Sequence, residues 1–478
     1  MDLLSWTGQI SFLNTALMAG FAALAAGVLL QFAAAFLPAG PAAQQVNPDG
    51  SLARAQGFQH LANSVVRYSF VALVLIVLGY IVIGAVLGQS AGIIGAVSRQ
   101  FVPVWIALVL TYAVSIRLKR RLGLYGKLFD STVGMIGFGI VMFWVFTAIF
   151  GGAFDMIVTH GVLEQSGAMK NKVPGTPYTK MVGDVADNAY AYYLLGGDNL
   201  GRDVFSRVVA GSWEVIKIAP FATLFAFMVG ITLGLPAGYY GGKLDTFLSF
   251  LANLILAFPV ILLFYLLVTP EIVATGIPVY MAAVLFVFPI IFLVILFNSR
   301  YFTQPAKRNL YLAITLVIGT WLYLGIAWNA DPLGLIAFPP NLLVVFVAVV
   351  FVNSPTVFRI VRGLALDIKT RDYVAAAQTR GEGPWYIMLW EILPNARGPL
   401  IVDFCLRIGY TTILLGTLGF FGLGLSPESP DWGSTINEGR KLLSIYLHPA
   451  LPPALSLLSL VLGLNLLADG LREESLKD

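Results

Sequence analysis

Few residues in this chain have the types and spacing that chemistry requires. The run 196–201 (Gly-Gly-Asp-Asn-Leu-Gly) has the glycine spacing of a phosphate-binding loop, but Arg202 and Asp203 follow where that loop needs Lys and then Ser or Thr. The histidines lie far apart, and none has a Cys, Asp or Glu at metal-ligand spacing; they are His60, His160 and His448. We therefore expect no nucleotide, cofactor or metal site in this chain, and no catalysis by it.

Charged residues inside apolar runs are the other candidates, because a charge within a bilayer is costly unless it faces protein or water. Lys217, Asp403 and Arg407 are of this kind. Asp403 and Arg407 lie four residues apart on one expected helix, which favours a structural ion pair over a place in a substrate path. The single cysteine, Cys405, excludes an internal disulfide and is interpreted as a small buried hydrophobic residue.

The composition shows whether these residues lie mainly in water or in a membrane. Apolar residues make up 58% of the 478 residues and charged residues 11%, and the mean hydropathy is +0.83. A helix needs about 20 apolar residues to span a bilayer, and an open sheet cannot face lipid. An all-α integral membrane protein is therefore predicted, with eleven spans near residues 13–36, 69–88, 101–117, 131–153, 214–238, 243–268, 279–297, 310–328, 341–358, 399–423 and 450–469. The span 101–117 is short and contains Pro103, so a re-entrant segment is the alternative there.

Lys and Arg are unevenly shared between the two sets of alternating loops. One set holds 19 and the other 8, of which five lie in the long segment 154–213. Because cytoplasmic loops carry the excess of basic residues, segment 359–398 and the C-terminus are predicted to be cytoplasmic and the N-terminus to face outward. The net charge of +4 thus reports topology and not nucleic-acid binding. No Lys or Arg precedes the first apolar run, which we interpret as a retained helix and not a signal peptide.

The longest hydrophilic stretch between spans on the basic side is 371–399, called the docking segment below. Its small residues predict a short helix that ends at Gly381, and Pro384 predicts the start of a second helix that ends at Pro394. Nothing in it can do covalent chemistry. The pattern is typical of a knob that docks on another protein.

The long segment 154–213 on the opposite side is polar and rich in Pro, Gly and Asp. Its last part predicts a helix capped by Asp198 or Asn199 that lies on the outer interface. The apolar stripe of that helix would consist of Leu200, Val204, Phe205 and Val208.

Four segments, in the same order, resemble motifs of binding-protein-dependent ABC importer permeases of the peptide, opine and nickel branch. The cytoplasmic loop of that family reads Glu-Ala-Ala, three residues, Gly, and about a dozen residues later Leu-Pro. Here the matching residues are Ala375, Ala376, Ala377, Gly381, Leu393 and Pro394. The other similar segments are 195–207, 238–245, and 418–433 together with 465–472.

The resemblance implies a core of six helices with about five extra ones. The implied division is 1–118 with three extra helices, 119–268 as the first half of the core with outer loop 154–213, 269–340 as an inserted helix pair, and 341–478 as the second half with the coupling loop 359–398. The core helices would be 131–153, 214–238, 243–268, 341–358, 399–423 and 450–469. An inserted pair preserves the orientation of everything that follows it.

The resemblance further implies a bacterial inner membrane protein with several partners. These would be a second homologous permease subunit, two ATPase subunits that bind ATP and Mg²⁺, an extracytoplasmic solute-binding protein, and membrane lipid. The implied ATPase-coupling residues are Arg371, Asp372, Tyr373, Ala375, Ala376, Ala377, Gly381, Glu382, Leu393 and Pro394. The residues of the outer-loop motif are Asp198, Gly201, Arg202, Asp203 and Arg207.

Two matters stay open in the sequence. Ala375 stands where the family has Glu, so docking is expected to rest more on helix shape and on neighbouring charges, those of Arg371, Asp372, Arg380 and Glu382. An ATP-independent secondary carrier, or an export or scaffold subunit that reuses the loop, remains the alternative; the scarcity of mid-span acidic residues argues against ion coupling. Peptides are the favoured substrate class.

Overall fold

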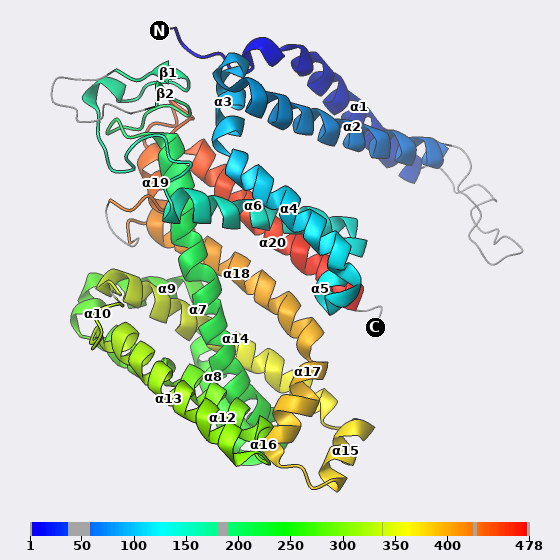
Figure 1. Ribbon diagram of the computed structural model, residues 1–478, viewed down its shortest axis with the longest axis vertical. Helices are drawn as coiled ribbons and strands as arrows, with labels where there is room; N and C mark the ends of the chain where they lie inside the picture. The colour runs from blue at the N-terminus through cyan, green and yellow to red at the C-terminus, as the bar shows by residue number, and fades with distance from the viewer. Residues whose placement is uncertain (1, 37–57, 180–189, 337, 424–427, 476–478) are drawn as a thin grey trace, which may run out of the picture. The chain divides into compact units, whose positions relative to one another are not determined.

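The computed structural model describes residues 2–36, 58–179, 190–336, 338–423 and 428–475. The chain divides into two compact units, one of Met1–Pro103 with Ser166–Asp203 and one of Val104–Gln165 with Val204–Asp478 (Figure 1). Arg54 and Lys180, which entered the charge count, and residues 424–427 of the fourth family-like segment lie outside the described residues. The described residues are mostly helical, which confirms the predicted fold class.

The first unit contains a pair of long helices and a small hairpin. Helices α1 (Phe12–Ala35) and α2 (Phe58–Leu87) pack along each other, and α2 leads through a 3₁₀ turn into α3 (Gly92–Gln100). Most side chains of α1 and α2 are apolar and exposed, as expected of helices that lipid surrounds. The strands β1 (Thr176–Pro177) and β2 (Tyr192–Tyr193) pair antiparallel within the outer segment.

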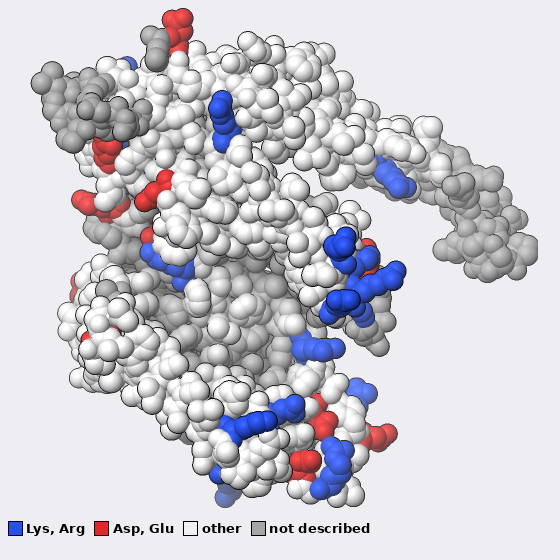
Figure 2. Space-filling view, viewed as in Figure 1, with Lys and Arg blue, Asp and Glu red and all other residues white. Residues whose placement is uncertain are grey.

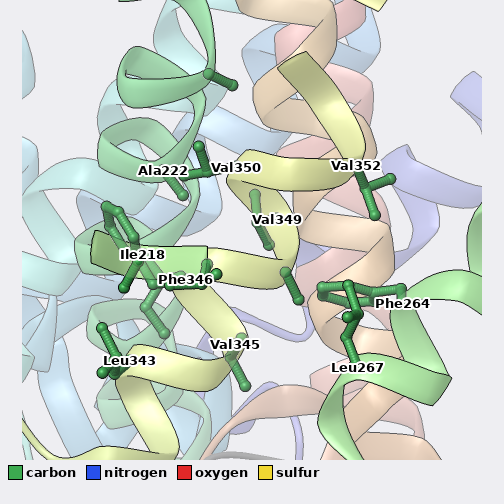
Figure 3. Packing of buried hydrophobic residues seen from close by; sticks show 14 of the residues in the cluster. Ile218, Ala222, Phe264, Leu267, Leu343, Val345, Phe346, Val349, Val350 and Val352 are labelled. Atoms are coloured by element: carbon green, nitrogen blue, oxygen red, sulfur yellow. The ribbon is translucent and has the colours of Figure 1, made fainter. Parts of the chain in front are cut away.

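The second unit is built around two crossing helices, α7 (Val204–Tyr240) and α14 (Pro340–Ile368). Figure 3 shows Ile218 and Ala222 of α7 meeting Phe346 and Val350 of α14 in the core between them. Most of the span residues of α14 are buried, so this helix is enclosed by protein and not by lipid. The other long helices are α4 (Val102–Leu118), α6 (Thr132–Thr147), α18 (Arg397–Phe420) and α20 (Leu451–Ser475), and the shorter ones include α5 (Gly123–Lys127) and α19 (Trp432–Arg440).

Among the described residues, the region after α7 departs most clearly from the predicted spans. Residues 243–268 form two helices, α8 (Gly242–Leu256) and α9 (Val260–Val268), bent by 80° at the break between them, where one span was expected. Pro259 precedes α9 and has no backbone N–H to continue the helix of α8. The next helices are α10 (Pro270–Ala274), α11 (Ile277–Leu285), α12 (Val287–Arg300) and α13 (Pro305–Trp328).

The remaining described elements are short. Helices α15 (Asp372–Thr379), α16 (Pro384–Tyr386) and α17 (Leu393–Asn395) belong to the docking segment. Two π-helical turns span Ala148–Ala153 and Ile387–Ile392. The 3₁₀ turns span Gly8–Ile10, Gly88–Ala91, Lys119–Arg121, Leu128–Asp130 and Gly167–Met169.

Length and composition agree with the predicted number of spans. Ten helical stretches of the described chain are long and apolar enough to cross a membrane, and the bent pair makes up to eleven. The uncertain span 101–117 is a continuous helix, because Pro103 falls in its first turn, where a missing N–H costs nothing. The predicted span 279–297 consists of α11 and α12, joined at Phe286.

Contacts within the second unit place four basic loops on one side. Ser131 donates a hydrogen bond to Glu473, which joins the loop before α6 to the C-terminal helix. Gly398 packs against Ser475, and Trp390 bonds to Ser299 at the end of α12. Figure 2 shows Lys and Arg gathered over the end that carries α15 and α16 and over α5. The predicted same-side placement of these loops is thereby confirmed.

Candidate functional site: the docking segment and an outer cavity

The first helix of the docking segment, α15, ends in a complete glycine turn. Gly381 has φ +77°, the left-handed conformation predicted for it. Its N–H donates to the carbonyl of Gln378 at 2.9 Å, and the N–H of Glu382 donates to the carbonyl of Ala377 at 3.2 Å. These are the two bonds of a Schellman motif, which satisfies the last carbonyls of the helix.

One face of α15 is anchored and the other is free. Val374 and Ala377 are fully buried in the hydrophobic cluster formed by the ends of α7, α14 and α18. Tyr373, Ala375 and Ala376 are exposed. A buried face with an exposed opposite face is the pattern of a helix that lies at the surface of its own subunit.

The second helix of the segment ends next to the predicted stop. It runs from Pro384 through the π-helical turn to Asn395, one residue beyond Pro394. The side chain of Asn395 donates to the carbonyl of Glu391 at 2.7 Å. Leu393 is half-buried against the same hydrophobic cluster that anchors α15.

Three of the four charges that were expected to compensate for Ala375, those of Arg371, Arg380 and Glu382, are engaged within the chain. Arg380 pairs with Glu391 at 2.9 Å and lies 3.9 Å from Glu382, so it joins the two helices across the Gly381 turn. Arg371 pairs with Asp367 at 3.2 Å. Exposed pairs of this kind contribute about 0–1 kcal/mol each, so they orient the turn more than they stabilise it.

Segment 238–245, which resembles a motif of the family, contacts the docking segment and the end of α14 that precedes it. Lys369 donates to the carbonyls of Gly238 and Tyr239 at 2.8 and 3.3 Å, and Gln378 donates to the hydroxyl of Tyr239 at 3.2 Å. Arg362 of α14 forms a two-pronged ion pair with Asp245. Spacing alone did not reveal this contact, since the partners are more than 110 residues apart in the chain.

Helix α12 also contacts the docking segment. Trp390 donates from Nε1 to the hydroxyl of Ser299 at 3.1 Å, and the guanidinium of Arg300 lies over the Trp390 ring. Phe292 and Ile295 of α12 face Trp385. Helix α12 thus braces the second helix of the segment, a role that the sequence did not suggest for it.

The outer-loop motif differs most from its prediction. The chain from Asp198 to Asp203 is a turn and not a helix, because the Asp198 carboxylate accepts from the N–H groups of Leu200 and Arg202 and from the Arg202 side chain. Gly201 has φ +78° in this turn. Helix α7 starts only at Val204. Leu200 is exposed while Val204, Phe205 and Val208 are buried, so the predicted interfacial stripe does not exist.

The motif residues are buried. Asp198, Arg202 and Asp203, which belong to the first unit, are each at most 2% exposed. In the second unit Arg207 is fully buried and donates to the carbonyl of Ser429 and to Thr435, both at 3.2 Å. These contacts tie the start of α7 to the loop before α19.

Trp432 and Asp431 extend that junction. Trp432 donates from Nε1 to the carbonyl of Val208 at 2.9 Å, and the Asp431 carboxylate caps α19 by accepting from the N–H of Ser434. Burial raises the pKa of the Asp431 carboxyl, although hydrogen bonds from Ser434 and the charge of Arg207 act in the opposite direction.

The charged residues found in apolar runs have partners. Arg407 pairs with Asp403 at 3.3 Å, the contact that their four-residue spacing predicted. Lys217 pairs with Glu214 at 2.7 Å, a partner that the sequence analysis missed. Both Lys217 and Glu214 line a cavity of about 520 Å³, which we call the outer cavity; its other polar lining residues are Asp155, Asn341, Glu428 and Ser429.

The fold defines the class of protein: a helical membrane protein, in which ten helical stretches of the described residues are long and apolar enough to span a bilayer. The family model of the "binding-protein-dependent transport system inner membrane component" matches residues 307–473, which contain the whole docking segment. The chain is 30% identical to the glutathione transport system permease protein GsiD of Pectobacterium atrosepticum, over 59% of this chain and 71% of the relative.

Dipeptide permeases match to a similar extent. The dipeptide transport system permease protein DppC of Haemophilus influenzae is 29% identical, and the probable D,D-dipeptide transport system permease protein DdpC of Escherichia coli is 28% identical, each over 59% of this chain and 72% of the relative. The chain belongs to the binding-protein-dependent transport system inner membrane components, as a multi-pass ABC transport permease of the peptide type.

Proposed function

We propose that this chain is one of two permease subunits of an ATP-driven importer and that it receives its energy through the docking segment. The observation that carries the proposal is the exposed face of α15 on a helix whose opposite face is fixed by Val374 and Ala377. A free, rigid helix face at the basic end of the molecule is what an ATPase groove requires. ATP, Mg²⁺ and hydrolysis then belong to two partner ATPase subunits, and this chain is not catalytic.

Rigid helices would transmit motion of the docking segment to the translocation path for the substrate. Closure of the ATPases moves α15, and the segment is continuous with α14 on one side and α18 on the other. Lys369 and Gln378 attach it to the end of α7 as well. Three long helices therefore share any displacement, and two of them, α7 and α14, form the core of the unit.

The outer cavity supports a peptide as the substrate class. The cavity presents an ammonium group on Lys217 and carboxylates on Glu214, Glu428 and Asp155. A zwitterionic peptide carries both complementary charges at its ends. The names of the relatives, which specify dipeptides and glutathione, agree with this assignment. Delivery by an extracytoplasmic solute-binding protein to the loops at this end completes the proposal.

The proposed topology has the docking segment and the C-terminus in the cytoplasm. The support is the excess of Lys and Arg in the loops that share their side. The N-terminus and segment 154–213 then face outward.

Uptake by the reconstituted complex tests the function. Proteoliposomes that contain both permease subunits and both ATPases are loaded with ATP, and uptake of a labelled dipeptide is measured with the outer binding protein present. We expect uptake that requires ATP hydrolysis and the binding protein, and none with this chain alone. Flux through this chain without ATP would establish the secondary carrier instead, and ATP-driven efflux would establish an exporter.

A further inference from the structure

A second cavity, separate from the outer cavity, lies between the inserted helices and α7. We call it the lateral cavity. It measures about 240 Å³ and is lined by apolar side chains apart from Thr315 and Tyr323. The hydroxyl of Tyr323 donates to the carbonyl of Ala283 at 3.0 Å, so it is already satisfied. A site with so little polar surface does not suit a peptide or water.

The lateral cavity opens toward the membrane. Ile314, Ile318 and Leu322 follow one another at four-residue spacing on α13, line the cavity, and are 44%, 47% and 40% exposed. Exposed apolar side chains on a membrane-spanning helix face lipid hydrocarbon. Hydrocarbon chains are the apolar groups available beside this cavity, and a chain that enters it gains dispersion contacts with the lining.

A cluster of positive charge lies at one end of the cavity. The turn between α12 and α13 carries Arg300, Lys307 and Arg308, and the sequence has no Asp or Glu between Glu271 and Asp331. Arg300 is engaged with Trp390, whereas the Lys307 side chain is exposed. Seven residues of helix separate Arg308 from Thr315, which is about 10 Å along the axis. That distance separates a lipid phosphate from the upper part of its acyl chains.

Aromatic side chains mark the depth between charge and cavity. Tyr311 stacks on Phe297 and on Tyr301, with ring centroids 5.2 and 5.0 Å apart. Rings of this kind gather at the membrane–water interface. The order along α12 and α13 is therefore basic turn, aromatic stack and apolar cavity, which matches headgroup, interface and acyl chain.

We propose that the inserted helix pair holds a site for an anionic phospholipid, with an acyl chain in the lateral cavity and the phosphate headgroup at Lys307 and Arg308. Both leaflets offer phospholipid, so the site does not depend on which side of the membrane the turn faces. It is also independent of the ATPase coupling proposed above. Basic pockets between membrane helices bind acidic headgroups through the same combination of groups.

Native mass spectrometry of the delipidated complex in detergent tests the site. Phosphatidylglycerol and phosphatidylcholine with identical acyl chains are the probes. We expect phosphatidylglycerol to bind about tenfold to thirtyfold more tightly, because each basic residue near an anionic headgroup contributes a factor of about five. The double variant Lys307→Gln/Arg308→Gln should lose that preference and keep weak binding of both lipids. The matched control Arg120→Gln/Arg121→Gln removes two exposed charges from another basic loop and should keep the preference.

Filling the cavity tests the acyl-chain half of the proposal. Ile318→Trp should abolish retention of both lipids, and Leu322→Trp, which enters from the exposed side, provides a second variant if the first fails to assemble. Wild-type binding without headgroup preference would overturn the headgroup site. Unchanged retention in both tryptophan variants would overturn the acyl site and leave a helix of a neighbouring subunit as the occupant.

Discussion

The guanidinium carbon of Arg300 lies 4.5 Å from the centroid of the Trp390 ring. The two residues belong to different parts of the chain: Arg300 ends the inserted helix α12, and Trp390 lies in the second helix of the docking segment. Ser299 accepts a hydrogen bond from the same indole. Helix α12 is therefore a further support for the docking segment, beside α7, α14 and α18, and loss of its contact should change coupling without touching the substrate path.

Replacement of Trp390 by Ala should loosen the docking segment. The variant loses the cation–π contact and the hydrogen bond, together about 1–2 kcal/mol. We expect fewer peptides transported per ATP hydrolysed in proteoliposomes. Trp390→Phe, which keeps a ring beneath Arg300, should lie nearer to wild type. Equal transport per ATP in Trp390→Ala and wild type would show that the brace has no part in coupling.

Replacement of Gly381 by Val should weaken ATPase docking. A β-carbon at Gly381 would meet no neighbouring atom, so the cost lies only in its left-handed backbone, about 1–2 kcal/mol. Gly383 is the matched control, because it has equal space and an ordinary φ of −68°. Co-purification of the ATPase should fall for Gly381→Val and not for Gly383→Val. Equal recovery of the ATPase with both variants would contradict the role of the turn.

Neighbouring alanines of α15 should respond differently to a carboxylate. Ala375 is exposed, so Ala375→Glu, which restores the residue usual in the family, should leave the melting temperature unchanged. Ala377 is fully buried, so Ala377→Glu places a charge in an apolar cluster and should strongly destabilise the protein. Thermal unfolding in detergent measures both. A melting temperature lowered equally by the two variants would refute the assignment of the free face.

The stability of the protein should depend on pH because of Asp431, which lies in the loop before α19. Burial raises the pKa of the Asp431 carboxyl in the folded chain. The folded state therefore binds the proton of Asp431 more tightly than the unfolded state does. The stability that the protonated Asp431 confers is lost as the pH rises from about 4 through the raised pKa. Asp431→Asn keeps the helix cap without the charge. Its melting temperature relative to wild type should increase with pH, and a pH-independent difference would exclude this titration.

The spans were predictable from the sequence because each element of a membrane helix is signalled locally, by an apolar run of sufficient length. The Gly381 turn and the Asp403–Arg407 pair were predictable for the same reason, since their partners lie within a few residues. The prediction of a helix from Asp198 was wrong, because the Asp198 carboxylate accepts hydrogen bonds from the backbone and side chain of Arg202 and so forms a turn instead of capping a helix.

Long-range partners were not predictable. Trp390 with Ser299 and Lys369 with Gly238 join residues 91 and 131 positions apart, and neither pairing leaves a periodic signal in one sequence. The bend between α8 and α9, next to Pro259, was also missed. Hydropathy is averaged along a span and does not show where the helix axis changes direction. These contacts determine which elements move with the docking segment.

Site-specific cross-linking of α15 tests the central claim most directly. The single native cysteine, Cys405, is buried, so a cysteine introduced by Ala376→Cys on the exposed face of α15 gives a specific reaction. A short reagent with a maleimide at one end and a photoreactive benzophenone at the other is coupled to this cysteine, and the purified complex is irradiated with and without ATP, so that the benzophenone inserts into a C–H bond of the neighbouring subunit. The account predicts a cross-link between this position and the ATPase subunit whose yield changes with ATP. An absent cross-link in a complex that still transports would contradict docking through this helix.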